Sequence, residues 1–176
     1  EGQKAIYYAC GESTQKLEIM PKVEALKEKY EILYCTEYVD EFALKTLGKY
    51  KDLDIVNINT ENTNSSDDEK IKKSNEEAKD MFKVMLEAVP EVKEIKFTDT
   101  LKNHPVCLSS IGTISVEMEK ALNQIPNGDK VQAEKVLEIN ESHEIAKKIK
   151  ELYNSDTEAL KNYTKILYAE ARLIEG

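Results

Sequence analysis

The chain has 176 residues, a formal net charge of -9 at pH 7 and 40% hydrophobic residues. This length allows one or two domains with a hydrophobic core, and the acidic balance disfavours nucleic acid as a partner, because nucleic-acid-binding surfaces need clustered Lys and Arg. The sequence has no run of about 18 apolar residues, which excludes a hydrophobic membrane-spanning helix.

Three cysteines, Cys10, Cys35 and Cys107, lie in apolar runs with strand character. An odd number in such runs indicates reduced, buried thiols rather than a disulfide framework. Because no signal peptide is visible, we expect a cytoplasmic protein. The chain begins at Glu1 without Met and ends at Gly176 directly after an apolar helix, so we also expect a piece of a longer protein.

Residues 4–59 alternate between strand and helix patterns. The predicted strands cover 5–10, 31–36 and 55–58. A helix that contains Leu17 and Met20 restarts at Pro21, where the missing N–H of proline costs nothing, and another helix covers 40–50. This β-α-β-α-β order predicts a small α/β layer with parallel strands.

A polar linker, 60–69, separates this block from the rest of the chain. The helix predicted after it, 68–88, ends before Pro90, because a residue that precedes proline disfavours the helical conformation. We therefore place a domain boundary near Asn62. The two predicted domains are 1–61 and 62–176.

The second domain combines short strands with helices. Its predicted strands cover 92–98, 105–109 and 135–139, and they form a small mixed or antiparallel sheet. Its further predicted helices cover 114–125, 142–153 and 156–174. The predicted fold class is therefore α+β overall: a small α/β subdomain followed by an α+β domain with a three-stranded sheet and helices.

The helix at 114–125 carries an apolar stripe at three- and four-residue spacing. The stripe consists of Ile114, Met118, Ala121, Leu122 and Ile125. Turns rich in Gly, Pro and Asn flank this helix, so it could stand off the sheet, and Met is a side chain suited to adaptable binding surfaces. Two interpretations stay open: the stripe belongs to the core, or it binds other polypeptides.

The last helix carries apolar side chains over more than one narrow stripe. These side chains are Leu160, Tyr163, Ile166, Leu167, Ala171, Leu173 and Ile174. Burying each large one contributes roughly 1.5–3 kcal/mol. A helix this widely apolar either packs wholly within its own domain or has its own core on one side and a partner on the other.

No catalytic, cofactor-binding or metal-binding residue is predicted. His104 and His143 have no metal-ligand spacing, and Ser109 lies in LSSIG rather than in a G-x-S-x-G nucleophile motif. A strand followed by Gly11 and a helix can hold an anion at the helix N-terminus. A small α/β binding protein or enzyme that uses the Gly11 turn as an anion site is therefore the alternative interpretation.

Several segments match one family in the same order along the chain. They are YYACGES from residue 7, MPKVEALKEK from residue 20, ILYCTEYVDEFALKTL from residue 32, VNIN from residue 56, HPVCLSS from residue 104, S-x-E-M-E-K from residue 115 and VLEIN from residue 136. Together they resemble the bacterial ninety-kilodalton heat-shock chaperones (high-temperature protein G). The resemblance covers nearly the whole chain and rests on the order of the matches, since no single segment is a catalytic motif.

The resemblance implies that 1–61 is a small α/β subdomain from the end of the middle segment of such a chaperone. It implies that 62–176 is a C-terminal domain for dimerisation and client contact, with a final helix expected after Gly176. The implied client-contact residues are Ile114, Met118, Ala121 and Leu122. The implied dimer-interface residues are Leu160, Tyr163, Ile166, Leu167, Ala171 and Ile174. Without the final helix, we expect weaker dimerisation.

The resemblance also implies that the parent protein is an ATP-driven chaperone of the heat-shock and stress response. In the family, ATP and magnesium bind an N-terminal domain, and a loop from the start of the middle segment assists hydrolysis; both lie outside this chain. We therefore expect no enzyme activity and no cofactor in this part. The expected partners are a second copy of the chain and unfolded or partly folded client proteins, with no nucleic acid and no membrane.

Overall fold

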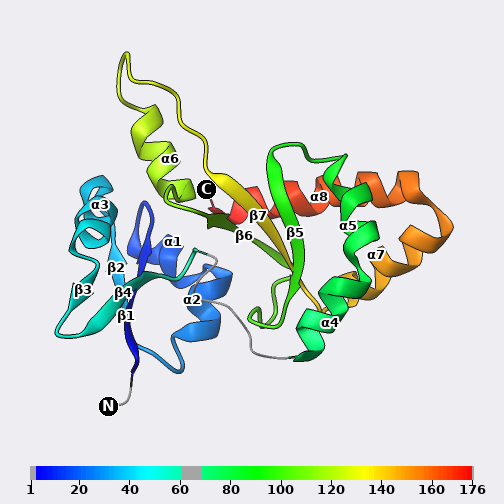
Figure 1. Cartoon of the computed structure of the whole chain (residues 1–176), viewed down its shortest axis with the longest axis horizontal. Coiled ribbons are helices and arrows are strands. Elements are labelled where there is room, and N and C mark those ends of the chain that lie inside the picture. Colours follow the sequence, from blue (N-terminus) through cyan, green and yellow to red (C-terminus); the bar gives the residue numbers. More distant parts are fainter. Residues whose placement is uncertain (1–2, 61–68, 176) are drawn as a thin grey trace. The chain divides into compact units, whose positions relative to one another are not determined.

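The computed structural model describes residues 3–60 and 69–175 (Figure 1). These residues form two compact units. The first unit joins the residues before 61 to Ser110–Glu134, and the second joins 69–109 to 135–175. Each unit has its own sheet and its own hydrophobic core, so the two are described separately.

The predicted boundary near Asn62 lies outside the described residues, and the division into 1–61 and 62–176 stays a prediction. The helix expected at 114–125 had been assigned to the second of these domains. In the structure it belongs to the compact unit of the N-terminal block, because Ser110–Glu134 packs there. The sequence contains no local signal for this grouping, since it depends on contacts between residues far apart in the chain.

The first unit is built on a four-stranded sheet with strand order β2-β1-β4-β3. The strands are β1 (Ala5–Cys10), β2 (Ile32–Cys35), β3 (Lys49–Tyr50) and β4 (Leu53–Asn57). The central strand β1 pairs in parallel with both β2 and β4, which confirms the predicted parallel layer. The two-residue strand β3 pairs antiparallel with β4 at the edge of the sheet.

Helices cover both faces of this sheet. They are α1 (Thr14–Glu18), α2 (Pro21–Leu26) and α3 (Tyr38–Leu47). A further helix of this unit, α6 (Val116–Asn123), packs against α3. Figure 1 shows α1 and α2 on one side of the strands and α3 on the other. The buried core on the α1/α2 side contains Ala9, Leu17, Met20, Val23 and Ile58. Because side chains alternate along a strand, Tyr8 and Cys10 of β1 face the side of α3.

The second unit is built on a three-stranded sheet with strand order β5-β7-β6. The strands are β5 (Val92–Thr98), β6 (Val106–Ile111) and β7 (Glu134–Asn140). The parallel pairing of β5 with β7 excludes the purely antiparallel sheet that the sequence had left open. The helices are α4 (Glu69–Glu77), α5 (Lys79–Leu86), α7 (Glu144–Ser155) and α8 (Thr157–Glu175).

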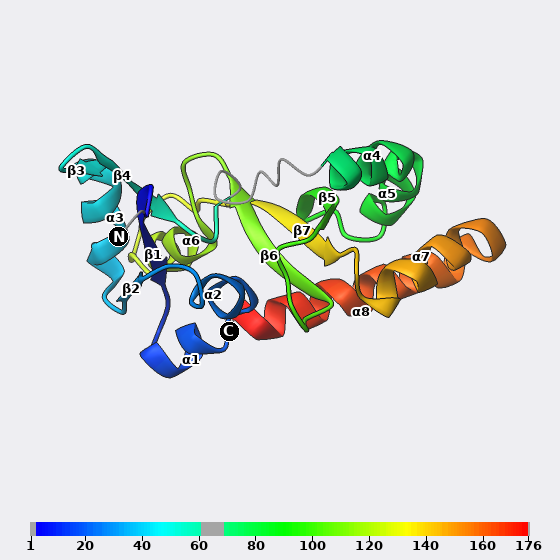
Figure 2. The ribbon, with the colours of Figure 1, turned by 90° about the horizontal axis from the view of Figure 1, so that it is seen from below.

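One core joins the sheet of the second unit to its helices. Helices α5, α7 and α8 cover one face of the sheet (Figures 1 and 2). The rings of Phe82 on α5 and Phe97 on β5 meet edge to face, with their centroids 5.0 Å apart. Ile149 of α7 and Leu160 of α8 complete this core and have no exposed surface. This packing buries one stripe of every helix that joins the core.

Two predicted helices differ from those observed. The single helix predicted at 68–88 is two helices, α4 and α5, separated at Ala78, which has φ -90° and ψ -1°. The helix predicted to reach residue 50 ends at Leu47, because Gly48 adopts the left-handed φ of 67° that closes a helix. In residues 3–60 and 69–175 no helix combines the length and the apolar character that crossing a membrane requires.

Candidate functional site

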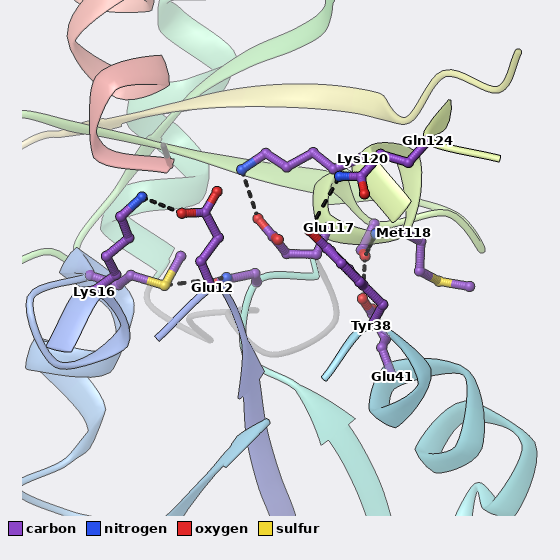
Figure 3. Close-up of polar contacts among 11 residues, drawn as sticks. Glu12, Lys16, Tyr38, Glu41, Glu117, Met118, Lys120 and Gln124 are labelled. Atoms are coloured by element: carbon purple, nitrogen blue, oxygen red, sulfur yellow. Dashed lines mark hydrogen bonds and ion pairs between the residues drawn. The ribbon is translucent and has the colours of Figure 1, made fainter. Parts of the chain in front are cut away.

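Helix α6 is attached to the first unit through its N-cap. The Ser115 side chain accepts a hydrogen bond from the Met118 backbone N–H at 3.0 Å and donates one to Glu41 Oε2 at 2.6 Å. Glu41 belongs to α3 and is only 2% exposed (Figure 3). The residue that begins α6 is therefore also the residue that fixes α6 to α3.

The buried Glu41 carboxylate has a second donor. Asn57, at the end of β4, donates from Nδ2 to Glu41 Oε1 at 2.8 Å and accepts from the Asn59 backbone N–H at 2.8 Å. A buried charged group is costly unless hydrogen bonds replace its water. Here one carboxylate joins α3, the end of β4 and the start of α6 in a single buried network.

Further contacts hold α6 against α3. Lys45 of α3 donates to the Thr113 carbonyl and lies 3.3 Å from the sulfur of Met118. At the other end of α6, Gln124 Nε2 donates to the Tyr38 hydroxyl at 3.2 Å (Figure 3). These contacts attach both ends of the helix to α3, and the expectation that it stands off a sheet is not contradicted by them.

Three of the four implied client-contact residues lie on this helix, and Ile114 precedes its N-cap. Ile114, Met118, Ala121 and Leu122 are all half-buried, and no residue from Val116 to Asn123 is fully buried. Met118 faces α3, as its contact with Lys45 shows. The adjacent Ile125 is 53% exposed. The apolar stripe is thus partly covered by its own unit and partly open to solvent, and its role in client contact stays a prediction.

A cavity of about 240 Å³ lies between α6 and the carboxyl ends of β1 and β2. Four carboxylates line it, from Glu12, Glu37, Glu41 and Glu117, together with the sulfur atoms of Cys10, Cys35 and Met118. Carboxyl ends of parallel strands are the common place for ligands in α/β sheets. The lining is acidic, which opposes the binding of an anion.

The turn at Gly11 has a structural explanation. A Cβ atom at this position would come within 2.9 Å of Cδ2 of Leu17, a side chain with no exposed surface. The helix after the turn, α1, has only five residues, and the Glu12 carboxylate lies beside it in an ion pair with Lys16 at 2.5 Å (Figure 3). Close packing against Leu17 therefore accounts for the glycine, and the negative charge disfavours an anion site.

The implied dimer-interface residues of α8 fall into two groups. Leu160, Leu167 and Ala171 are at most 2% exposed and belong to the core of their own unit. Ile166 is 60% exposed, and Tyr163 and Ile174 are half-buried. Leu173 was not among the implied interface residues but is 83% exposed. The outward side of α8 is therefore apolar at Ile166 and Leu173, seven residues apart.

The histidines and Cys107 have structural partners. His143 is the N-cap of α7, where its Nδ1 accepts from the Ile145 backbone N–H at 3.2 Å. The His104 carbonyl accepts from Asn140 Nδ2 at 3.1 Å, and Cys107 is 1% exposed. In the part of the chain that the structure describes, no group of three or more His, Cys, Asp or Glu side chains could hold a metal ion.

Sequence reasoning missed two carboxylates that are buried in the described part of the chain, those of Glu41 and Glu138. Glu138 of β7 has no exposed surface and accepts from the Ser109 hydroxyl at 2.6 Å, with Lys96 Nζ 3.9 Å away. The sequence does indicate that Glu138 is buried, because it is a charged residue inside the apolar run VLEIN. Glu41 gives no such signal, since an acidic residue in the first turn of a helix is common on exposed surfaces.

Comparison with known proteins shows which family and which proteins the sequence of this chain resembles. The family model described as Hsp90 protein matches residues 1–176. Proteins named Chaperone protein HtpG are similar over the full length of this chain: 49% identical in Clostridium acetobutylicum, 46% in Clostridium perfringens and 44% in Natranaerobius thermophilus. The chain spans 29% of the length of each of these relatives.

Proposed function

The chain belongs to the Hsp90 protein family, and from this premise we propose that it is the dimerising and client-binding part of an ATP-dependent chaperone. Residues 1–61 correspond to the end of the middle segment and 62–176 to the C-terminal domain. ATP and magnesium bind elsewhere in the whole protein, so this part is not an enzyme. The whole protein acts in the cytoplasm during heat shock and other stress.

The observation that carries the client-binding role is the partial exposure of α6. Its N-terminus is fixed by the buried Glu41–Ser115 hydrogen bond, while its other end leaves Leu122 half-buried and Ile125 53% exposed. A helix that is held against its own unit but leaves apolar side chains exposed near its C-terminal end offers a surface for exposed hydrophobic segments of unfolded proteins. Met118 adds a soft, polarisable side chain beside this surface.

Client binding should depend on Leu122 of α6 and on Ile125, which follows the helix. We expect the double variant Leu122→Glu/Ile125→Glu to bind an unfolded client at least about tenfold more weakly, because each apolar side chain contributes roughly 1.5–3 kcal/mol when buried. The measurement is suppression of the aggregation of a thermally unfolded client as a function of chain concentration. Neither position accepts or donates the hydrogen bonds that hold α6 to α3.

The matched control is Val39→Glu, which introduces the same charge at a 67% exposed apolar residue of α3. This variant should suppress aggregation as well as the unchanged chain does. Circular dichroism and urea unfolding verify that all three chains are equally folded. Undiminished suppression by the folded double variant would contradict a role for α6 in client contact.

The outward side of α8 supports dimerisation. Ile166 and Leu173 are 60% and 83% exposed, while Leu160, Leu167 and Ala171 on the opposite side of the helix are held in the core. Large apolar side chains exposed on one side of a long helix are typical of an interface with another helix. In a two-fold dimer each such residue contributes twice, because both copies use the same surface.

Self-association should therefore depend on Ile166 and Leu173 rather than on the buried residues of α8. We expect Ile166→Glu/Leu173→Glu to weaken dimerisation by at least about a hundredfold, since four apolar side chains lose their burial in one dimer. Sedimentation velocity over a range of concentrations measures this change. The control is Ile19→Glu, at a 69% exposed residue of the first unit. If the double variant and this control dimerised equally tightly, the proposed interface would be contradicted.

A further inference from the structure

Two thiols lie side by side at the carboxyl edge of the first sheet. Cys10 is the last residue of β1 and Cys35 the last residue of β2, and the parallel register pairs them directly. Both side chains line the same cavity, and neither cysteine is in a disulfide. Residues paired in register on adjacent strands project to the same face, so the two sulfur atoms are held together by the sheet itself.

Both thiols open into the cavity of about 240 Å³ beneath α6. Cys10 is 5% exposed and Cys35 is half-buried, so a ligand that enters the cavity meets Cys35 first. The Cys10 side chain lies next to Cys35 on the adjacent strand and lines the same cavity, so it is placed to bind the same atom. The sheet thus provides two preorganised sulfur ligands and space for a third substituent beside Tyr38 and Met118.

The surrounding charge selects the kind of ligand. Burial and the nearby Glu41 carboxylate raise the pKa of the Cys10 thiol, and burial and Asp40 raise the pKa of the Cys35 thiol. Both groups are therefore neutral thiols at neutral pH. The acidic lining opposes any reaction that leaves added negative charge in the cavity. A neutral reagent that joins both sulfur atoms and releases only neutral products avoids this cost.

We propose that Cys10 and Cys35 form a dithiol site for monosubstituted trivalent arsenicals, R–As(OH)₂. Two As–O bonds break and two As–S bonds form, and each thiol proton leaves with a hydroxide as water. Arsenic stays trivalent, so the step needs no oxidant or reductant, and the charge of the cavity does not change. The product has two sulfur ligands and the organic group on arsenic, which matches a site with two thiols.

Titration of the reduced chain with phenylarsine oxide tests this site. We expect one phenylarsenic group per chain by intact-mass spectrometry, with two thiols lost and the bridge mapped to Cys10 and Cys35. An excess of the monothiol 2-mercaptoethanol should leave the adduct in place, and 2,3-dimercaptopropanol should remove it, because only a dithiol matches the two-point attachment. Cys107→Ser, which removes the remaining cysteine, should bind like the unchanged chain.

The variants Cys35→Ser and Cys10→Ala should each bind at least about tenfold more weakly, since each leaves one sulfur ligand. Cys35 is half-buried, so Cys35→Ser should keep the fold even if substitution of the buried Cys10 disrupts it. Urea unfolding measures the stability of both variants. Tight binding by folded Cys35→Ser would overturn the proposal. So would a bridge that involves Cys107, or an adduct that forms only in urea.

Discussion

Leu160→Ala should lower the free energy of unfolding by about 2–5 kcal/mol, the range for large-to-small substitutions in a packed core. Leu160 has no exposed surface within a single chain and belongs to the core of the second unit. Removing its side chain leaves a cavity between α8 and its neighbours, and the surrounding helices relax only in part. The loss should be equal at low and high protein concentration, because it arises inside one chain.

Urea unfolding at two widely separated chain concentrations measures this effect. The control is Ile166→Ala on the same helix, which at the low concentration, where the chain is monomeric, should change the free energy of unfolding by less than about 0.5 kcal/mol, because Ile166 is 60% exposed. A loss in Leu160→Ala that grows with chain concentration would show instead that Leu160 contributes to an interface. The pair of variants therefore separates the core residues of α8 from its outward residues.

The extent of α8 was predictable from the sequence, but the orientation of its apolar residues was not. The helix was expected at 156–174 and is observed at Thr157–Glu175. A core and a protein interface both select apolar side chains, so the pattern does not distinguish Leu167, which is buried, from Ile166, which is exposed. Only the positions of the sheet and the other helices determine which side of α8 faces inward.

Strands were predicted more closely than helix ends. The run 5–10 and the run 92–98 coincide with β1 and β5, because apolar β-forming residues are flanked by clear breaks. The break at Ala78 between α4 and α5 escaped prediction, since Ala is a strong helix former. Strand β3 escaped because two exposed residues carry no pattern of burial.

Candidate site contacts were less predictable because they join residues far apart in the chain. In the sequence, Ser115 has no feature beyond its place in a family match, and its partner Glu41 lies 74 positions earlier. The contact between Cys10 and Cys35 required the register of two parallel strands, which strand prediction alone does not provide. Local patterns therefore identified the elements of the site, while its chemistry depends on tertiary pairing.

Glu41→Ala should lower the free energy of unfolding of the first unit by about 2–4 kcal/mol, because it removes two buried hydrogen bonds to a charged group. Its donors, Asn57 Nδ2 at 2.8 Å and the Ser115 hydroxyl at 2.6 Å, are on residues that are 5% and 2% exposed. They would lose an acceptor in a place where water does not readily replace it. Urea unfolding of the chain measures the total loss.

The same variant should detach α6 before the sheet unfolds. Ser115 would still cap the helix through the Met118 N–H, so α6 keeps its local start but loses its buried link to α3. Amide hydrogen exchange should therefore accelerate more in Val116–Asn123 than in β1. Glu41→Gln should give a smaller loss, because one amide oxygen still accepts while the amide nitrogen faces a donor.

Glu18→Gln, at an exposed residue of α1, is the matched control and should leave exchange in α6 unchanged. Equal acceleration in α6 and β1 of Glu41→Ala would mean that the carboxylate stabilises the unit as a whole rather than the attachment of one helix. A selective effect on α6 would instead make Glu41 the residue that sets how readily the apolar stripe becomes exposed. In that case Glu41→Ala, with α6 released and its stripe intact, should bind unfolded clients more tightly than the unchanged chain.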